Sequence, residues 1–167
     1  RELVRRAEAG EQVEVCAGSS VRTEIRVYDG DVESLTVAES RGVGVRVIRD
    51  GREGLAHAGS WDPDVIYTLL AEARDNMSFA EPDDRVGLAE PDGVDAADID
   101  PWDDRIEATS VDDKVAIAVA LEAATRGADP RVRGVRTSMY ADSRGESAIV
   151  STAGIDGWDR GASASIG

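Results

Sequence analysis

This chain of 167 residues has few histidine and cysteine side chains from which to build a hydrolytic or metal site. His57 is the only histidine and Cys16 the only cysteine, whereas a hydrolytic zinc site needs about three nitrogen, sulfur or carboxylate ligands. Ser19, Ser20 and Ser151 lie outside any G-x-S-x-G sequence, so no nucleophile elbow is predicted. We therefore name no catalytic, cofactor-binding or metal-binding residue within this sequence.

The residues that remain are expected to have structural roles. His57 lies in the strand-like sequence L-A-H-A, which favours a surface or interstrand position over metal binding. Cys16 is expected to be an interior strand thiol, and a lone cysteine excludes an intrachain disulfide. For Trp61, Trp102 and Trp158 we expect burial in the core, with packing at a binding surface as the alternative.

The charge of the chain excludes some classes of partner. The sequence has 34 acidic and 19 basic residues, giving a net charge of −15, which repels nucleic-acid backbones and anionic membranes. No apolar run approaches the roughly 18 residues of a membrane span, and residues 1–10 lack the apolar core of a signal peptide. We expect no direct nucleic-acid binding, no membrane contact and a cytoplasmic location.

The elements of the first half are predicted from alternation and turn residues. Residues 2–9 resemble the end of a helix closed by Gly10, and a strand follows over 13–17. Residues 21–63 alternate apolar and polar side chains and carry turn signals at Asp29-Gly30, Arg41-Gly42 and Asp50-Gly51. They predict a meander of about four antiparallel strands.

Two helices and a second series of strands are predicted further along. Asp62 and Pro63 begin a helix to about residue 77, and Ser110 begins another that ends near Gly127. Between them, residues 81–113 carry thirteen acidic residues against two arginines and read as a surface connector. Its apolar residues could anchor it to the domain: Val86, Leu88, Ile99, Trp102 and Ile106.

After the second helix, residues 135–140, 147–152 and 158–166 are expected to be strands, separated by turns at 142–145 and 154–157. We therefore predict an α+β fold of antiparallel β-meanders packed with helices. The expected organisation is a first helix and meander unit at 1–80, an acidic connector at 81–109 and a second helix and strand unit at 110–167. A diverged internal repeat and ordinary hairpin turns at similar spacing both explain the similar order of elements in the two units.

The order of several short motifs indicates a family. They are D-G-x-V-E-S from Asp29, S-R-G-x-G-V-R-V-I from Ser40, D-G-R-x-G-x-A from Asp50 and the D-P pair at Asp62. This series resembles the N-terminal region of the TldD/PmbA metallopeptidases. The second half adds S-V-x-x-K at 110–114, L-E-x-A at 121–124 and A-D-P-R-V at 128–132, followed by Tyr140 and S-T-A-G-I-D-G at 151–157. These runs are similar to the PmbA (TldE) branch, whose S-x-G-x-x-G strand region corresponds to residues 151–157.

The resemblance implies a heterodimeric zinc peptidase that cuts unfolded or modified peptides inside the cell. In that family a TldD-type subunit holds the zinc through an H-E-x-x-x-H motif, which this sequence lacks. The resemblance places the active site in the C-terminal half of the family, and this sequence ends at Gly167 within an expected strand. The implied partners are an unfolded peptide and a TldD-like catalytic subunit, or a second copy in a homodimer, while this domain serves peptide enclosure and subunit pairing.

A second class of function remains open from the residues themselves. An exposed edge of an antiparallel sheet accepts an extended peptide through main-chain hydrogen bonds, with little dependence on sequence. The chain could therefore be a free-standing acidic protein- or peptide-binding module without hydrolytic activity. That alternative predicts a monomer that is indifferent to chelators.

Overall fold

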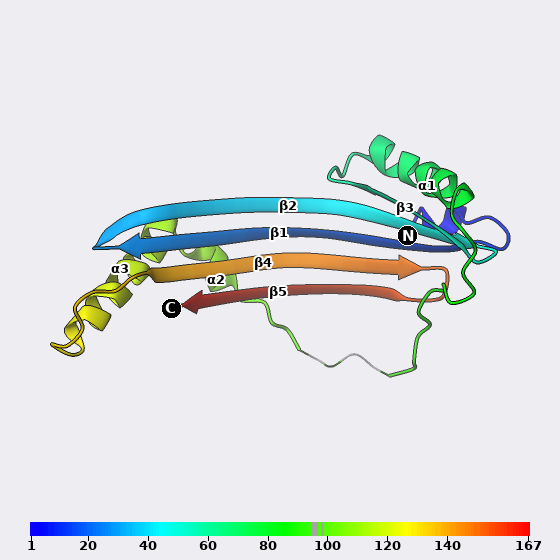
Figure 1. Ribbon diagram of the computed structural model, residues 1–167. Coiled ribbons are helices and arrows are strands. Elements are labelled where there is room, and N and C mark those ends of the chain that lie inside the picture. The colour runs from blue at the N-terminus through cyan, green and yellow to red at the C-terminus, as the bar shows by residue number, and fades with distance from the viewer. Residues whose placement is uncertain (95–96, 98) are drawn as a thin grey trace. The chain divides into compact units, whose positions relative to one another are not determined.

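The structure is a computed structural model that describes residues 1–94, 97 and 99–167. Its strands form one five-stranded antiparallel sheet. The strand order is β3-β2-β1-β4-β5 (Figure 1). The strands are β1 (Gln12–Tyr28), β2 (Asp31–Arg49), β3 (Arg52–Ala58), β4 (Ser138–Ser151) and β5 (Asp156–Ile166). The helices are α1 (Pro63–Ser78), α2 (Asp104–Ala108) and α3 (Val111–Gly127). These elements confirm the predicted α+β fold.

The strands are longer than the sequence predicted. Asp29 and Gly30 have φ of 55° and 85°, and Asp50 and Gly51 have φ of 53° and 73°, so both predicted D-G hairpin turns form. Gly42 does not adopt a positive φ, and β2 continues through it. The predicted turn at Arg41-Gly42 is therefore wrong. The turn predicted at 142–145 is wrong for the same reason, because β4 continues through those residues.

Two other predicted segments differ. The N-terminal helix is reduced to a 3-10 turn at Val4–Arg6. The acidic connector contains the five-residue helix α2, whose first turn is capped by the Asp103 side chain. Of its predicted anchors, Ile99 is wrong, because it is 73% exposed. Asp95, Ala96 and Asp98, which belong to the predicted connector, lie outside the described residues.

The helix starts were predicted correctly. The Asp62 side chain accepts the N–H of Asp64 at 3.0 Å, and Pro63 occupies the first helical position of α1. Ser110 Oγ accepts the N–H of Asp113 at 3.1 Å and begins α3. None of the described helices is both long and apolar enough to cross a membrane.

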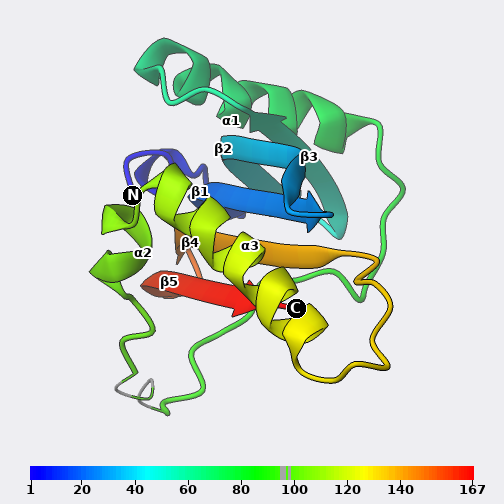
Figure 2. The same cartoon turned by 90° about the vertical axis from the view of Figure 1, so that its left-hand side faces the viewer.

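The chain divides into two compact units, each assembled from three separate segments. Unit 1 comprises Arg1–Ser19, Ser40–Asp98 and Glu146–Asp159, and unit 2 comprises Ser20–Glu39, Ile99–Gly145 and Arg160–Gly167. In unit 1, α1 lies along β3 (Figure 2), and its buried Leu69, Ala73 and Met77 pack in one core with Val45 and Val47 of β2. These buried residues are four positions apart, which is the spacing of the core-facing side of an amphipathic helix.

Unit 2 has its own core beneath α3. Ile25 and Val27 of β1 are fully buried and pack with Ala118 of α3 and Tyr140 of β4. Lys114, only 4% exposed, pairs with Asp142 at a distance of 2.6 Å between Nζ and Oδ2. A buried charge of this kind needs its partner, since an unpaired ion in the interior costs several kcal/mol, of order 3–5.

Candidate functional site

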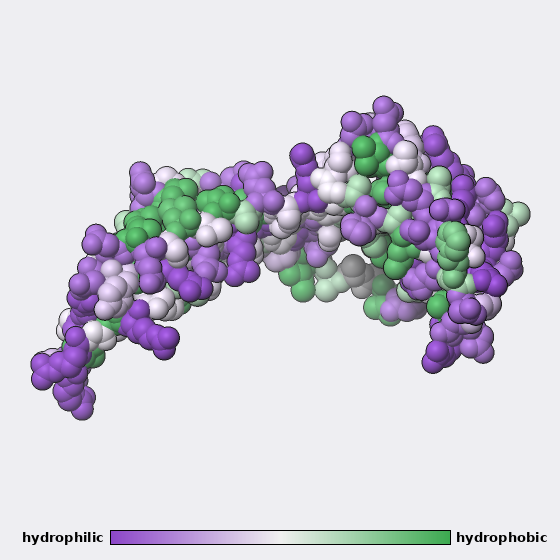
Figure 3. Space-filling view, turned by 45° about the horizontal axis from the view of Figure 1, so that its top comes forward, coloured by the Kyte–Doolittle hydropathy of each residue, from purple (hydrophilic) through white to green (hydrophobic). Residues whose placement is uncertain are grey.

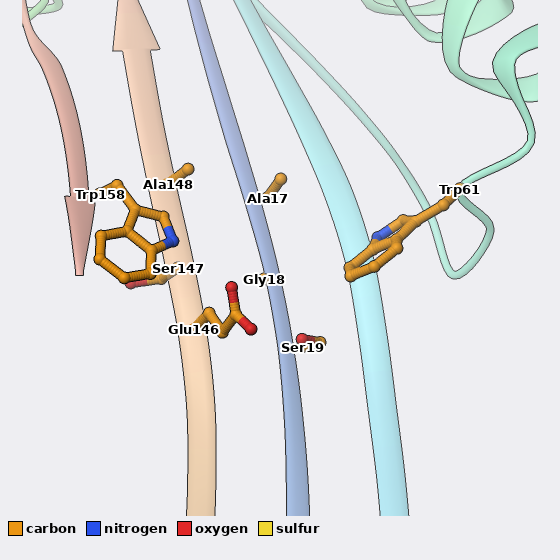
Figure 4. A pocket seen from close by; sticks show the side chains of 8 residues that line it. All are labelled: Ala17, Gly18, Ser19, Trp61, Glu146, Ser147, Ala148 and Trp158. Atoms are coloured by element: carbon orange, nitrogen blue, oxygen red, sulfur yellow. The ribbon is translucent and has the colours of Figure 1, made fainter. Parts of the chain in front are cut away.

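A groove lies in unit 1 between two exposed tryptophans (Figure 4). Its volume is about 130 Å³. The lining comes from β1, the segment before α1, β4 and β5: Ala17, Gly18, Ser19, Trp61, Glu146, Ser147, Ala148 and Trp158. Figure 4 shows the two indoles at opposite sides, with the small side chains between them. The groove therefore has a floor of small side chains and two aromatic walls.

The exposure of the tryptophans corrects the prediction that they belong to the core. Trp61 is 48% exposed and Trp158 is 61% exposed, and Trp102 is only partly buried. Trp61 comes directly before the cap of α1, and Trp158 lies on β5 at the end of the strand order, so neither is enclosed by a second layer of the unit. Large exposed aromatic side chains are typical of binding surfaces.

Close approach of two strands keeps the floor of the groove narrow. A Cβ added to Gly18 of β1 would lie 3.2 Å from the carbonyl oxygen of Glu146 on β4. A second hollow of about 340 Å³ shares Ala17, Ser147, Ala148 and Trp158 with the groove. Trp158 thus borders both hollows.

Glu146 supplies the only charged side chain of the groove lining. The residue is exposed, and Figure 4 shows its carboxylate between the two indoles and directed toward β1. Within the described part of the chain, Glu146 forms no ion pair. No pattern in the sequence selects Glu146 or Gly18, because their roles depend on which strands become neighbours.

An open sheet edge lies in unit 2. β3 pairs with β2 only from Val43, opposite Ala58, to Arg49, opposite Arg52. Among the strands that the structure describes, none pairs with the outer side of β2 over residues 31–39. This stretch is exposed at every residue. It is an unpaired edge of the kind that accepts another strand.

Apolar side chains accompany this edge (Figure 3). Val32 and Leu35 are each 44% exposed, and Val37 is 49% exposed. Leu35 and Val37 are two residues apart and share one face of β2. Soluble chains usually protect an edge with charge or cover it, so exposed apolar residues here indicate an interaction surface.

Two domains of one metallopeptidase family match this chain. Domain 1 of the PmbA/TldA metallopeptidases matches residues 13–76, and the central domain of the same family matches residues 104–167. The chain belongs to the PmbA/TldD metallopeptidase family. No curated protein matches the chain closely enough to count as a relative.

Solved structures share the fold of this PmbA/TldD family member. A proposed modulator of DNA gyrase from Thermotoga maritima has a TM-score of 0.81 at 22% identity, over 94% of this chain and 35% of that one. TldE from Thermococcus kodakarensis has a TM-score of 0.81 at 21% identity, over 93% and 35%. A proposed modulator of DNA gyrase from Bacteroides thetaiotaomicron has 0.79 at 23% identity, over 93% and 36%. The chain spans about a third of the length of these relatives.

The described residues of this family member do not fit a metal. None of them form a group of three or more histidine, cysteine, aspartate or glutamate side chains that could hold an ion. His57 is exposed on β3 opposite Gly44. The described residues therefore provide no ligand set for the metal that the family name implies.

Cys16 differs from its predicted interior position, because it is exposed on β1. Val13, Val15 and Ala17 point into the core of unit 1, and alternation places Cys16 on the opposite face, where it lines the second hollow. Desolvation, with a smaller contribution from the Glu14 carboxylate, raises the pKa of the Cys16 thiol above its ordinary value. A raised pKa makes the thiol a poor nucleophile at neutral pH.

Proposed function

We propose that this domain holds an extended peptide and pairs with a second subunit in a TldD/TldE-type zinc metallopeptidase, while catalysis takes place on a TldD-like subunit. The observation that carries the proposal is the open edge of β2 over residues 31–39 in a member of a metallopeptidase family. The proposed substrates are unfolded or modified peptides, and the proposed location is the cytoplasm.

The edge suits a substrate without a fixed sequence. The two-residue turn at Asp29-Gly30 makes Tyr28 and Asp31 a hydrogen-bonded pair by the rule for such hairpins. Alternate N–H groups from Val32 onward, including that of Ser34, are then directed away from β1. A strand added there bonds to main-chain groups, which every peptide has.

Charge favours a partner other than a second copy. Residues 31–39 contain Asp31, Glu33 and Glu39 and no basic residue. Antiparallel pairing of two such edges would bring six carboxylates together, and like charges on paired strands are destabilising. We propose a heterodimer with a TldD-like subunit over a homodimer for this reason.

The domain would contribute no metal ligand to this assembly. Zinc would be bound by the TldD-like subunit and would supply the activated water there. The role left to this chain is to bind and orient a peptide, which its exposed edge and its groove both support.

The test is a reconstituted cleavage reaction with matched edge variants. The chain is mixed with a TldD-like metallopeptidase subunit, zinc and an unstructured peptide. Ser34→Pro removes one outward N–H, and Ser34→Ala keeps it. We expect cleavage by the wild-type and Ser34→Ala pairs, its loss on zinc removal, and a decrease of about tenfold for Ser34→Pro, equivalent to one lost hydrogen bond.

Two results would contradict the proposal. Equal cleavage by the Ser34→Pro and Ser34→Ala pairs would show that the edge of β2 is not used. An intact peptide in the presence of zinc and both chains would favour the binding module without hydrolytic activity.

A further inference from the structure

We propose that the groove between Trp61 and Trp158 binds a basic side chain, a guanidinium or an ammonium group, of an extended peptide. This inference rests on the proposed function, since it names the class of peptide that the domain would hold. The groove lies wholly within unit 1 and is separate from the edge of β2 over residues 31–39.

The aromatic walls suit a cation. Indole is the strongest of the aromatic side chains in attracting a cation to its face, with contact within about 6 Å of the ring. Both indoles in the groove are at least 48% exposed, so a ligand can reach them. The molecule uses the same contact elsewhere, because the Arg160 guanidinium lies 5.3 Å from the centre of the Trp102 ring.

The charge of the groove selects the sign of the ligand. Glu146 projects between the two indoles, and none of the eight lining residues is basic. A cationic group placed there gains attraction from the carboxylate and from a chain of net charge −15. An anionic side chain would be repelled by the Glu146 carboxylate.

The same composition favours an organic cation over a metal ion. Calcium takes about six to eight oxygen ligands, whereas the groove offers one carboxylate and the hydroxyls of Ser19 and Ser147. A lysine or arginine side chain needs fewer oxygen ligands, because its methylene stem packs on apolar surface while its head group remains hydrated. Ala17, Gly18 and Ala148 provide such a surface between the walls.

The groove is open, so a single side chain should bind weakly. One exposed cation–π contact and one exposed ion pair together contribute at most about 2 kcal/mol, which corresponds to a Kd on the order of tens of millimolar or weaker. Such a site would act by adding selectivity to a peptide that is held elsewhere along its backbone.

The test is an NMR titration of the 167-residue chain that follows the indole N–H signals. The probes are the N-acetyl amides of arginine and lysine, and the N-acetyl amide of citrulline, which has nearly the shape of arginine without its charge. Signals are assigned with Trp61→Phe and Trp158→Phe. We expect arginine or lysine amide to shift the signals of Trp61 and Trp158 saturably, with citrulline amide binding at least about fivefold more weakly.

Glu146→Gln is the variant that isolates the charge, and Glu72→Gln on the exposed surface of α1 is its matched control. Glu146→Gln should weaken the binding of the cationic amides by about threefold or more and leave the binding of citrulline amide unchanged. Equal binding of arginine and citrulline amides, no saturable shift, or equal effects of the two glutamate variants would overturn the proposal.

Failure here can be distinguished from failure of the proposed function. The titration involves neither a second subunit nor cleavage, and the Ser34 variants do not alter the groove. If the groove does not bind cations but the edge of β2 does bind a peptide, the domain would still hold the peptide and would lack only the preference for basic side chains.

Discussion

The carboxylate of Glu122 on α3 accepts the backbone N–H of Gly30 at 2.8 Å, across 92 positions in the sequence. Its second oxygen accepts the N–H of Asp29, also at 2.8 Å. Both donors belong to the turn that begins β2, so Glu122 fixes the position of the turn from which the open edge starts. Arg126 adds an ion pair to Asp29 at 2.8 Å on the surface of the same helix.

Glu122→Gln should destabilise the chain by about 2–4 kcal/mol, because the amide NH₂ group would face a backbone donor in a nearly buried position. Urea unfolding measures the loss. The same substitution at exposed Glu72 should change the free energy of unfolding by less than about 0.5 kcal/mol. Similar losses in both variants would show that the contacts of Glu122 with the turn contribute little.

Gly54 of β3 is required by the packing of α1. A Cβ there would collide with the backbone oxygen of Ala73 and with Met77. Gly54→Ala should therefore destabilise unit 1 by about 1–3 kcal/mol, through displacement of the helix. Gly44→Ala is the control, since a Cβ on Gly44 has no neighbour within 4 Å. Thermal unfolding of both variants checks this, and equal melting temperatures would contradict the close contact of helix and strand.

Glu11 should make the stability of the chain depend on pH. Desolvation by itself raises the pKa of Glu11, but hydrogen bonds from Arg74 and from the N–H of Glu8 outweigh it, and the pKa lies below its ordinary value of 4.5. The unfolded chain therefore binds a proton first as pH falls. The contribution of Glu11 is complete above the unfolded pKa and is lost as pH falls through the lowered folded pKa.

Comparison with Glu11→Gln isolates this contribution. The difference in unfolding free energy between wild type and Glu11→Gln should be greatest near pH 7 and should shrink as the pH is lowered toward about 3. A difference that stays constant over this range would show that the Glu11 carboxylate gains nothing from Arg74.

Tyr140 provides a second titration, at high pH. Desolvation, and to a smaller extent the hydrogen bond of 2.9 Å that its hydroxyl donates to Asp142, raises the pKa of Tyr140 to about 12. A raised folded pKa gives stability that is complete below the unfolded pKa and is lost as pH rises through about 12. The difference in phenolate absorbance between wild type and Tyr140→Phe should therefore appear near pH 12. A difference that appears near pH 10, the ordinary value for tyrosine, would contradict the buried position of its hydroxyl.

Local chemistry made part of this structure predictable. Asp62 and Ser110 cap helices, and Asp29-Gly30 and Asp50-Gly51 turn the chain, because each feature depends on residues adjacent in sequence. The turn expected at Arg41-Gly42 was wrong, since the same dipeptide is compatible with a continuous strand.

The groove could not be predicted from the same information. Alternation shows which residues share a face of a strand, but not whether another layer covers that face. For this reason Cys16, Trp61 and Trp158 were expected inside and are exposed. Glu146 and Gly18 meet only because β4 lies beside β1, which depends on the topology of the whole sheet.

The most direct test of the central claim is amide hydrogen exchange along β2, measured by NMR with and without the TldD-like subunit and an unstructured peptide. In the chain alone, the N–H groups of Ser34 and Thr36 should exchange fast and those of Glu33 and Leu35 slowly, because only the latter face β1. Addition of the partner should slow exchange at Ser34 and Thr36 by about tenfold or more. Unchanged exchange at these two residues in a complex that cleaves the peptide would contradict the proposal that β2 accepts a strand.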